Sequence, residues 1–169
     1  SAYGILGRAQ AAYFQMVNEK GGINGRKIKF ISLDDAFSPP KTVEATRRLV
    51  EDDGVFLTVS SVGTAAQSAV QKYLNAKKVP QLFLSTGASK FNDPARFPMT
   101  TPILHLYSTE GEVYARYLLA NKPDAKVGVL MQNDDFGRDF VNGFKKVLGA
   151  KAATMIVREA TFEVADPTI

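Results

Sequence analysis

Apolar positions along the chain switch repeatedly between helical and strand-like spacing. Between Ile5 and Val17 they recur every three or four residues, which predicts an amphipathic helix. The segment 27–35 (KIKFISLDD) alternates early and becomes apolar later, as a strand does. Two prolines then precede the segment 41–54, whose apolar stripe and terminal Gly54 predict a second helix.

The same alternation runs through the rest of the chain. We expect further strands at 55–61, 79–86, 126–134 and 153–162, and further helices at 64–78, 108–125 and 136–150. Strands separated by helices are typical of an α/β fold, in which helices cover a parallel sheet.

A proline-containing loop interrupts this alternation at 87–107. It makes Met99 to Tyr107 the expected hinge, with one domain over 1–104 and another over 105–169. Strands on both sides of the hinge end in Asp-Asp near a Phe. Either two similar lobes or chance would explain this weak internal repeat. The chain opens on a helix and stops where another helix should begin. We therefore expect a fragment that lacks a first strand and much of a second lobe.

Composition and charge exclude several classes of protein. Of 169 residues, 45% are hydrophobic and 22% are charged, which is ordinary for a soluble domain with a core. No apolar run approaches the roughly 20 residues of a membrane span, and no signal peptide is recognisable at the start. The net charge of +4 comes without a basic cluster that contains aromatic residues, so we expect no nucleic-acid partner.

The residues that most enzymes need are also scarce. The chain has no cysteine and a single histidine, His105, which excludes a thiol nucleophile and argues against a metal site and Ser-His catalysis. Neither a Walker lysine nor a dinucleotide-binding glycine loop occurs in the required context, so we expect no cofactor. The expected cleft positions offer no paired carboxylates, no nucleophile with a base and no metal set, so we expect no enzymatic activity.

Small and hydroxyl residues end two successive strands, in the turns 60–64 (SSVGT) and 85–89 (STGAS). Open parallel sheets bind ligands at the carboxyl ends of their strands, where helix N-termini offer free N–H groups. The two turns therefore predict a cradle for an anionic group. Helix capping and turn formation explain the same residue types and stay open as an alternative.

Other candidate residues carry weaker signals. Asp34 and Asp35 follow a strand, as in the Mg²⁺ pocket of receiver domains, but the next strand end has no carboxylate, which favours capping. His105 is either a structural hydrogen-bond partner or a ligand contact. Three aromatic residues lie at element edges where they would form either packing contacts or cleft walls: Tyr3, Tyr107 and Phe136.

The chain resembles a known family over nearly its whole length. The residues that carry the resemblance are 7–55, with the motif NEKGGINGRKI…DDAFSPPK, then 63–89 and 114–140. They are similar to the branched-chain amino-acid binding family of ABC-importer solute-binding proteins. The resemblance implies a two-lobed type I periplasmic-binding fold, with parallel sheets that carry helices on both faces. Members are longer than this chain, which agrees with a fragment.

The resemblance implies that the two turns bind the ligand's head group. Ser61 corresponds to the hydroxyl that donates to the ligand carboxylate. Gly63 and Thr64 open the helix that faces it. Ala88 and Ser89 resemble the backbone and hydroxyl pair of the other turn.

The resemblance also implies an aromatic enclosure. Tyr3 corresponds to a wall from the first loop, and Phe136 to the ring that closes from the second lobe. Several amino-acid binders carry an acid near the hinge. Tyr107 and His105 stand there in this chain, which makes an aromatic or aliphatic carboxylate without an amine a credible ligand.

The function implied is that of an extracytoplasmic solute-binding protein. It would capture a small carboxylate, either a branched-chain amino acid or an aromatic or aliphatic acid, between two lobes that close like a Venus flytrap. It would deliver this ligand to the membrane permease of an ABC importer, as a monomer. The location would be the periplasm, or the outer surface of a Gram-positive cell through a lipid anchor. The alternative is the ligand-sensing domain of a signalling receptor with the same fold.

Overall fold

The computed structural model describes residues 3–166 and divides into two compact units. The first unit is Ser1–Ala36 and the second is Phe37–Ile169. Helix α1 (Gly4–Glu19) lies in the first unit, and none of its residues is buried. The predicted helix at this position is confirmed.

Two side-chain hydrogen bonds and one aromatic contact hold the first unit together. The side chain of Asn18 binds both backbone groups of Ile28, accepting from its N–H at 2.7 Å and donating to its carbonyl at 2.8 Å. The rings of Phe14 and Phe30 lie 5.3 Å apart. These contacts join α1 to the extended segment that follows the glycine-rich turn.

The predicted strand at 27–35 is wrong for this structure. The segment is extended, but within residues 3–166 it joins no sheet. A strand is stabilised by hydrogen bonds to a neighbouring strand, so alternating sequence alone does not produce one. In its place, Asn18 supplies the hydrogen bonds of Ile28.

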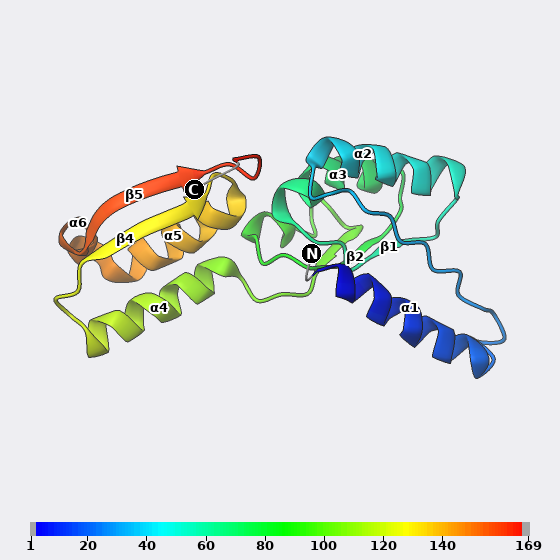
Figure 1. Cartoon of the computed structure of the whole chain (residues 1–169), viewed down its shortest axis with the longest axis horizontal. Coiled ribbons are helices and arrows are strands. Elements are labelled where there is room, and N and C mark those ends of the chain that lie inside the picture. The colour runs from blue at the N-terminus through cyan, green and yellow to red at the C-terminus, as the bar shows by residue number, and fades with distance from the viewer. Residues whose placement is uncertain (1–2, 167–169) are drawn as a thin grey trace. The chain divides into compact units, whose positions relative to one another are not determined.

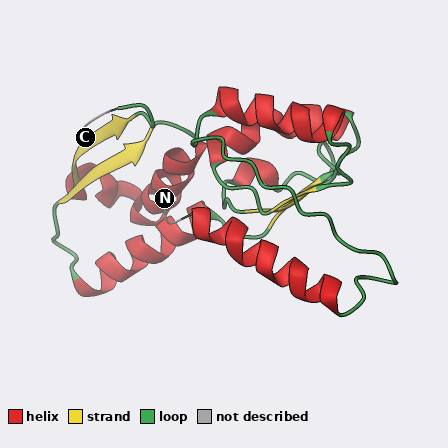
Figure 2. Cartoon of the chain, turned by 45° about the vertical axis from the view of Figure 1, so that its right-hand side comes forward, coloured by secondary structure: helices red, strands yellow, loops and turns green. Residues whose placement is uncertain are grey.

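The second unit begins with a small parallel sheet. Its strands are β1 (Thr58–Val59), β2 (Gln81–Leu84) and β3 (Thr100–Pro102), hydrogen-bonded in that order. Loops separate these strands from the helices around them (Figure 2). The sequence predicted β1 and β2 longer than they are and missed β3, which lies within the expected loop.

Helices α2 (Pro39–Arg47) and α3 (Thr64–Ala76) accompany this sheet and pack on each other (Figure 1). The two prolines occupy the first turn of α2, where their missing N–H groups cost no helical hydrogen bond. A π-helical turn, η1 (Arg48–Asp52), continues α2, and a 3₁₀ turn, η2 (Ser89–Phe91), follows β2.

A buried polar network joins α3 to the sheet. Gln81 is fully buried, and its amide donates to the Gln67 side chain at 3.1 Å. Its carbonyl oxygen accepts from the Thr100 hydroxyl at 3.1 Å, and Thr100 in turn accepts from Asn75 at 2.9 Å. Satisfied buried networks of this kind fix the arrangement of the elements that supply them.

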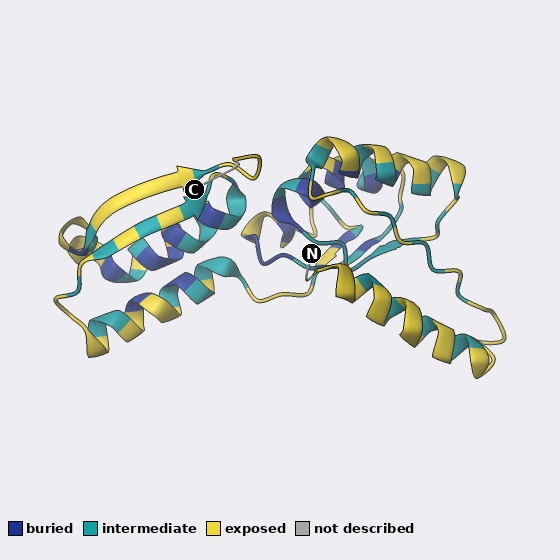
Figure 3. Cartoon of the chain, in the orientation of Figure 1, coloured by how far each residue is buried: buried dark blue, intermediate teal, exposed yellow. Residues whose placement is uncertain are grey.

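The rest of the second unit contains a second parallel sheet. Strands β4 (Val127–Gln132) and β5 (Ile156–Phe162) pair with each other, and most of β5 is exposed (Figure 3). The helices are α4 (Tyr107–Asn121), α5 (Asp135–Leu148) and the short α6 (Ala152–Met155), which follows the 3₁₀ turn η3 (Gly149–Lys151). Helix α5 packs against α4 and β4, around a core of Ala115, Phe144, Leu148 and Met155.

The predicted α/β class with parallel strands is confirmed. The helices predicted around 64–78, 108–125 and 136–150 are also confirmed, each within a few residues of its bounds. The two sheets lie on either side of the proposed division between residues 104 and 105. That division into lobes stays a prediction.

Candidate functional site

The turns 60–64 and 85–89 follow neighbouring parallel strands and lie side by side. The N–H of Ser60 donates to the carbonyl of Leu82 at 2.9 Å, and the N–H of Ser85 donates to the carbonyl of Ser61 at 3.0 Å. The juxtaposition that the sequence suggested is therefore present at the carboxyl ends of β1 and β2. The ligand contacts assigned to these turns stay predictions.

A hydroxyl pair joins the two turns from inside. The hydroxyl oxygens of Thr64 and Thr86 lie 2.7 Å apart, and both residues are buried. The N–H of Ala88 donates to the Thr86 hydroxyl at 3.3 Å. Because the Thr64 hydroxyl is hydrogen-bonded to Thr86, its side chain links the two turns. A ligand at this residue would therefore contact its backbone N–H.

Gly63 shapes the start of α3. It is the N-cap residue, with φ of 102°, a conformation that strongly favours glycine. It offers no side-chain oxygen to the first N–H groups of the helix, so these remain for a ligand or solvent. Ser61 is partly buried and precedes Gly63 by two residues in the same turn.

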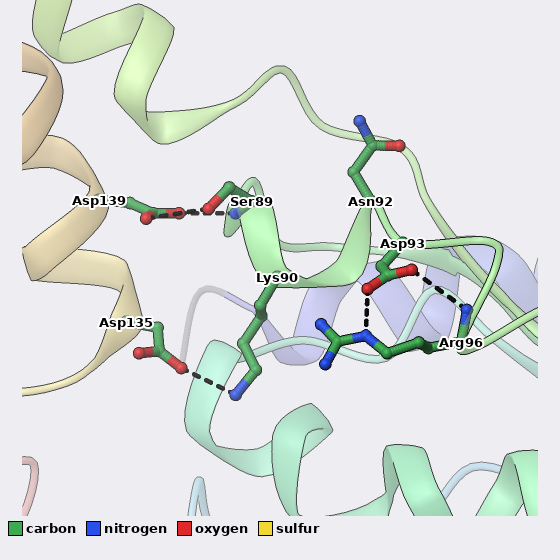
Figure 4. A pocket seen from close by; sticks show the side chains of 7 residues that line it. All are labelled: Ser89, Lys90, Asn92, Asp93, Arg96, Asp135 and Asp139. Atoms are coloured by element: carbon green, nitrogen blue, oxygen red, sulfur yellow. Dashed lines mark hydrogen bonds and ion pairs between the residues drawn. The ribbon is translucent and has the colours of Figure 1, made fainter.

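Ser89 binds a carboxylate that belongs to the chain itself. Its N–H donates to Oδ2 of Asp139 at 2.6 Å, and its hydroxyl donates to Oδ1 at 3.0 Å (Figure 4). The adjacent Lys90 donates to Asp135 at 2.8 Å. Asp135 and Asp139 lie one turn apart on α5, so two consecutive residues of η2 meet two carboxylates of one helix face.

A polar pocket of about 310 Å³ surrounds these pairs. Its lining consists of Ser89, Lys90, Asn92, Asp93, Arg96, Asp135 and Asp139 (Figure 4). Lys90 pairs with Asp135, and Arg96 pairs with Asp93. Within residues 3–166, no cationic side chain forms an ion pair with Asp139, whose partners are the neutral donors of Ser89.

The ion pairs of the pocket shift the acidity of two carboxyl groups. The hydrogen bond from Lys90 holds the pKa of Asp135 below its ordinary value, and Arg138 adds a smaller attraction. The hydrogen bond from the Arg96 side chain likewise lowers the pKa of Asp93. Both carboxyl groups are therefore ionised at neutral pH.

Two predicted aromatic residues meet beside the second turn. The rings of Tyr107 and Phe136 lie 4.8 Å apart, edge to face at 71°. Tyr107 also packs against the buried cluster of Leu84, Ala88 and Phe91, and its N–H donates to the Gly87 carbonyl at 3.0 Å. Asp134 caps α5 by accepting from the N–H of Phe136 at 2.9 Å.

Glu110 lies three residues after Tyr107, at the start of α4, which corrects the interpretation that no acid lies near Tyr107. Glu110 accepts from the Tyr114 hydroxyl at 2.8 Å, and its other oxygen lies 2.9 Å from Nε2 of His105. These hydrogen bonds, that of His105 foremost, lower the pKa of Glu110. His105 is thus a hydrogen-bond partner of Glu110, and its contact with a ligand stays a prediction.

Tyr3 belongs to the first unit, where it is the N-cap residue of α1 and is 64% exposed. Its role as a cleft wall stays a prediction. In the described part of the chain, no three His, Cys, Asp or Glu residues are grouped so that they could hold a metal ion. Nor does any helix between residues 3 and 166 have the length and apolar character to cross a membrane.

Sequence reasoning missed Lys90, Asp135 and Asp139. The four-residue spacing of the two aspartates was a visible signal, because it places both carboxylates on one face of α5. Their partners lie 45 and 50 residues earlier, and no periodic pattern connects residues at that separation.

The profile of a family described as periplasmic binding protein matches residues 2–168. The Leu/Ile/Val-binding protein BraC3 of Rhizobium johnstonii is 28% identical over 164 residues, which are 95% of this chain and 43% of that protein. A substrate-binding periplasmic protein from Ralstonia solanacearum superposes with a TM-score of 0.80 at 28% identity, over 97% of this chain and 47% of that one.

A third similarity concerns the fold. The solute-binding protein of an ABC transporter from R. palustris, solved in complex with benzoate, superposes with a TM-score of 0.78 at 22% identity. The match covers 98% of this chain and 46% of that one. The chain thus spans less than half the length of each of these relatives.

Proposed function

This chain belongs to the periplasmic binding protein family, and we propose that it is part of an extracytoplasmic solute-binding protein that delivers a small carboxylate to an ABC permease. The members of the family are substrate-binding proteins and not enzymes. The complete protein acts as a monomer, in the periplasm or anchored by a lipid to the outer face of a Gram-positive membrane.

The juxtaposition of the two turns is the observation that carries this proposal. One turn contains Ser61 and opens α3 with N–H groups that have no side-chain cap. The other turn already holds a carboxylate, that of Asp139, through the N–H and hydroxyl of Ser89. Donors arranged in this way suit a carboxylate, and the adjoining rings of Tyr107 and Phe136 suit an apolar tail.

Two ligand classes agree with this arrangement. The Rhizobium relative is named as a Leu/Ile/Val-binding protein, and branched aliphatic tails fit a wall of aromatic rings. The R. palustris structure contains benzoate, so the same fold accommodates an acid without an amine. We propose that the ligand is a monocarboxylate of one of these classes.

A thermal-shift panel on the full-length protein tests the proposal. Leucine, isoleucine and valine are compared with benzoate, 4-hydroxybenzoate and phenylacetate. A ligand at about a hundred times its dissociation constant stabilises the folded state by roughly 2.7 kcal/mol, which shifts the melting temperature measurably. Stabilisation by one class supports the proposal and assigns the class. A melting temperature that none of the six compounds changes contradicts the proposed ligand.

A further inference from the structure

We propose that Asp139 is a specificity residue that excludes a second anionic group from the Ser89 end of the site. Its carboxylate fills the donors of Ser89, so the ligand's single carboxylate binds at the other turn, around Ser61 and Gly63. The inference rests on the proposed function, and it adds the requirement that the end of the ligand nearest Ser89 be neutral or cationic.

The geometry of the Ser89–Asp139 contact leaves no free donor on Ser89. The two carboxylate oxygens of Asp139 each accept one hydrogen bond from Ser89, at 2.6 and 3.0 Å. A bound carboxylate would use the same two donors, because an ionised carboxylate only accepts and Ser89 has one N–H and one O–H. Asp139 therefore takes the place that a ligand carboxylate would occupy.

The charge of the pocket also disfavours an anionic ligand group. Its lining contains three carboxylates (Asp93, Asp135 and Asp139) and two cations (Lys90 and Arg96). Each cation pairs with a carboxylate other than Asp139. An anionic ligand group would have to displace Asp139 and then remain close to it, whereas a neutral or cationic group meets no such repulsion.

The first turn offers the opposite environment. Residues 60–64 contain no acid, and Gly63 leaves the N-terminus of α3 uncapped. The positive end of a helix dipole stabilises an anion. The two turns lie side by side but differ in charge, and this difference orients a ligand that carries one carboxylate.

Calorimetric titration of the full-length protein tests this assignment with two matched pairs of compounds. Leucine is compared with glutamate, and benzoate with terephthalate, since the second member of each pair adds a carboxylate. The proteins compared are the wild type, Asp139→Ala, Asp139→Asn and the double variant Asp139→Ala with Ser89→Ala. Asp124→Asn is the control, because it makes the charge change of Asp139→Asn at an exposed residue outside the pocket.

In the wild type, we expect the monocarboxylate of at least one pair to bind more tightly than the dicarboxylate. Asp139→Ala should raise the affinity for the dicarboxylate, relative to that for the monocarboxylate of the same pair, by about fivefold or more. This factor corresponds to the repulsion expected between unit charges about 4 Å apart in water. Asp139→Asn should shift the same ratio in the same direction, and Asp124→Asn should leave it unchanged. Loss of the Ser89 hydroxyl in the double variant should reverse part of the gain.

Two results would overturn the assignment while leaving the proposed function intact. One is an unchanged ratio in Asp139→Ala although a monocarboxylate binds. The other is an equal loss of affinity for both members of a pair, which would make the Ser89–Asp139 contact a clamp between η2 and α5. Failure of all four compounds to bind any variant would contradict the proposed function as well.

Discussion

The hydroxyl oxygens of Thr64 and Thr86 lie 2.7 Å apart and are the buried link between the two turns of the candidate site. Thr64 is the first residue of α3, Thr86 lies two residues after the end of β2, and 22 positions separate them in the sequence. The distance between the backbones of the two turns therefore depends on this pair. A ligand that contacts both turns needs that distance to be fixed.

Replacing either threonine by valine should lower the free energy of unfolding. Thr64→Val leaves one buried hydroxyl without its partner, which costs about 1–3 kcal/mol. Thr86→Val should cost more, because the N–H of Ala88 then loses its acceptor as well. Urea unfolding of the full-length protein measures both values.

Thr64→Ser is the control, since it keeps the hydroxyl and should recover most of the stability. The double variant should be less destabilised than the sum of the two single variants, because removing both hydroxyls leaves fewer buried groups unpaired. A Thr64→Val variant as stable as the wild type, beside a loss of stability in Thr64→Ser, would show that the methyl packing matters and the hydrogen bond does not.

The helices could be predicted from the sequence because their signal is local. Helix α5 was expected at 136–150 and is found at Asp135–Leu148, since its apolar stripe and the Asp134 cap lie within the segment itself. Strand β3 was missed because Thr100–Pro102 is too short for an alternating pattern, and only pairing with β2 makes it a strand. The segment 27–35 shows the converse, a strand-like pattern without a hydrogen-bonded neighbour among the described residues.

The candidate site could likewise be predicted only in part. The two turns could be found because parallel strands bring their carboxyl ends to one edge of the sheet. The contact between Ser89 and Asp139 could not, because it depends on how η2 packs on α5 across 50 residues of sequence. Glu110 was overlooked although it lies one helical turn after Tyr107, within reach of its sequence neighbours His105 and Tyr114.

Gly143→Ala should destabilise the packing of α4 on α5. A Cβ atom at Gly143 would lie 2.0 Å from the backbone carbonyl oxygen of Ser108, so the two helices would have to move apart. Overpacking of this kind costs about 1–3 kcal/mol, enough to outweigh the gain of roughly 1 kcal/mol from alanine in a helix. Differential scanning calorimetry of the full-length protein should show a lower melting temperature.

The control for this variant is Gly128→Ala on β4, where a Cβ atom would have no neighbour within 4 Å. It should change the melting temperature little. A melting temperature of Gly143→Ala at or above that of the wild type would mean that α4 and α5 are not in the close contact that the structure shows.

The stability supplied by Glu110 should depend on pH. Its hydrogen bonds hold the pKa of the Glu110 carboxyl group in the folded protein below its ordinary value. A carboxyl group with a lowered pKa stabilises the folded state above the unfolded pKa of about 4.3, and this contribution disappears as pH falls through the folded pKa. Glu110→Gln should therefore destabilise the protein at pH 7 and should have a smaller effect at about pH 3.

Urea unfolding of the full-length protein at the two pH values measures this difference. Glu44→Gln is the control, because Glu44 is an exposed carboxylate of α2 without an ion pair among residues 3–166. The difference between the two variants should shrink on acidification. A difference that stays constant would show that the Glu110 side chain acts through packing, without a contribution from its charge.

Phe136→Ala should weaken ligand binding if Phe136 and Tyr107 enclose the apolar tail. The two rings pack edge to face at 4.8 Å, and removing one of them exposes the other to solvent. If the ring contacts the ligand, such a contact contributes about 0.5–1.5 kcal/mol beyond buried area, so we expect the dissociation constant of the ligand found in the thermal-shift panel to rise at least about twofold. Calorimetric titration of the full-length protein measures this change.

Phe83→Ala is the matched control, since Phe83 lies on β2, is 45% exposed and is absent from the Tyr107 cluster. It should leave the dissociation constant within error of the wild type. Phe136→Leu should retain part of the affinity, because it keeps an apolar surface but loses the ring contact. If Phe136→Ala binds as tightly as Phe83→Ala, the Tyr107–Phe136 contact belongs to the packing of α4 on α5, and the apolar wall of the site must lie elsewhere.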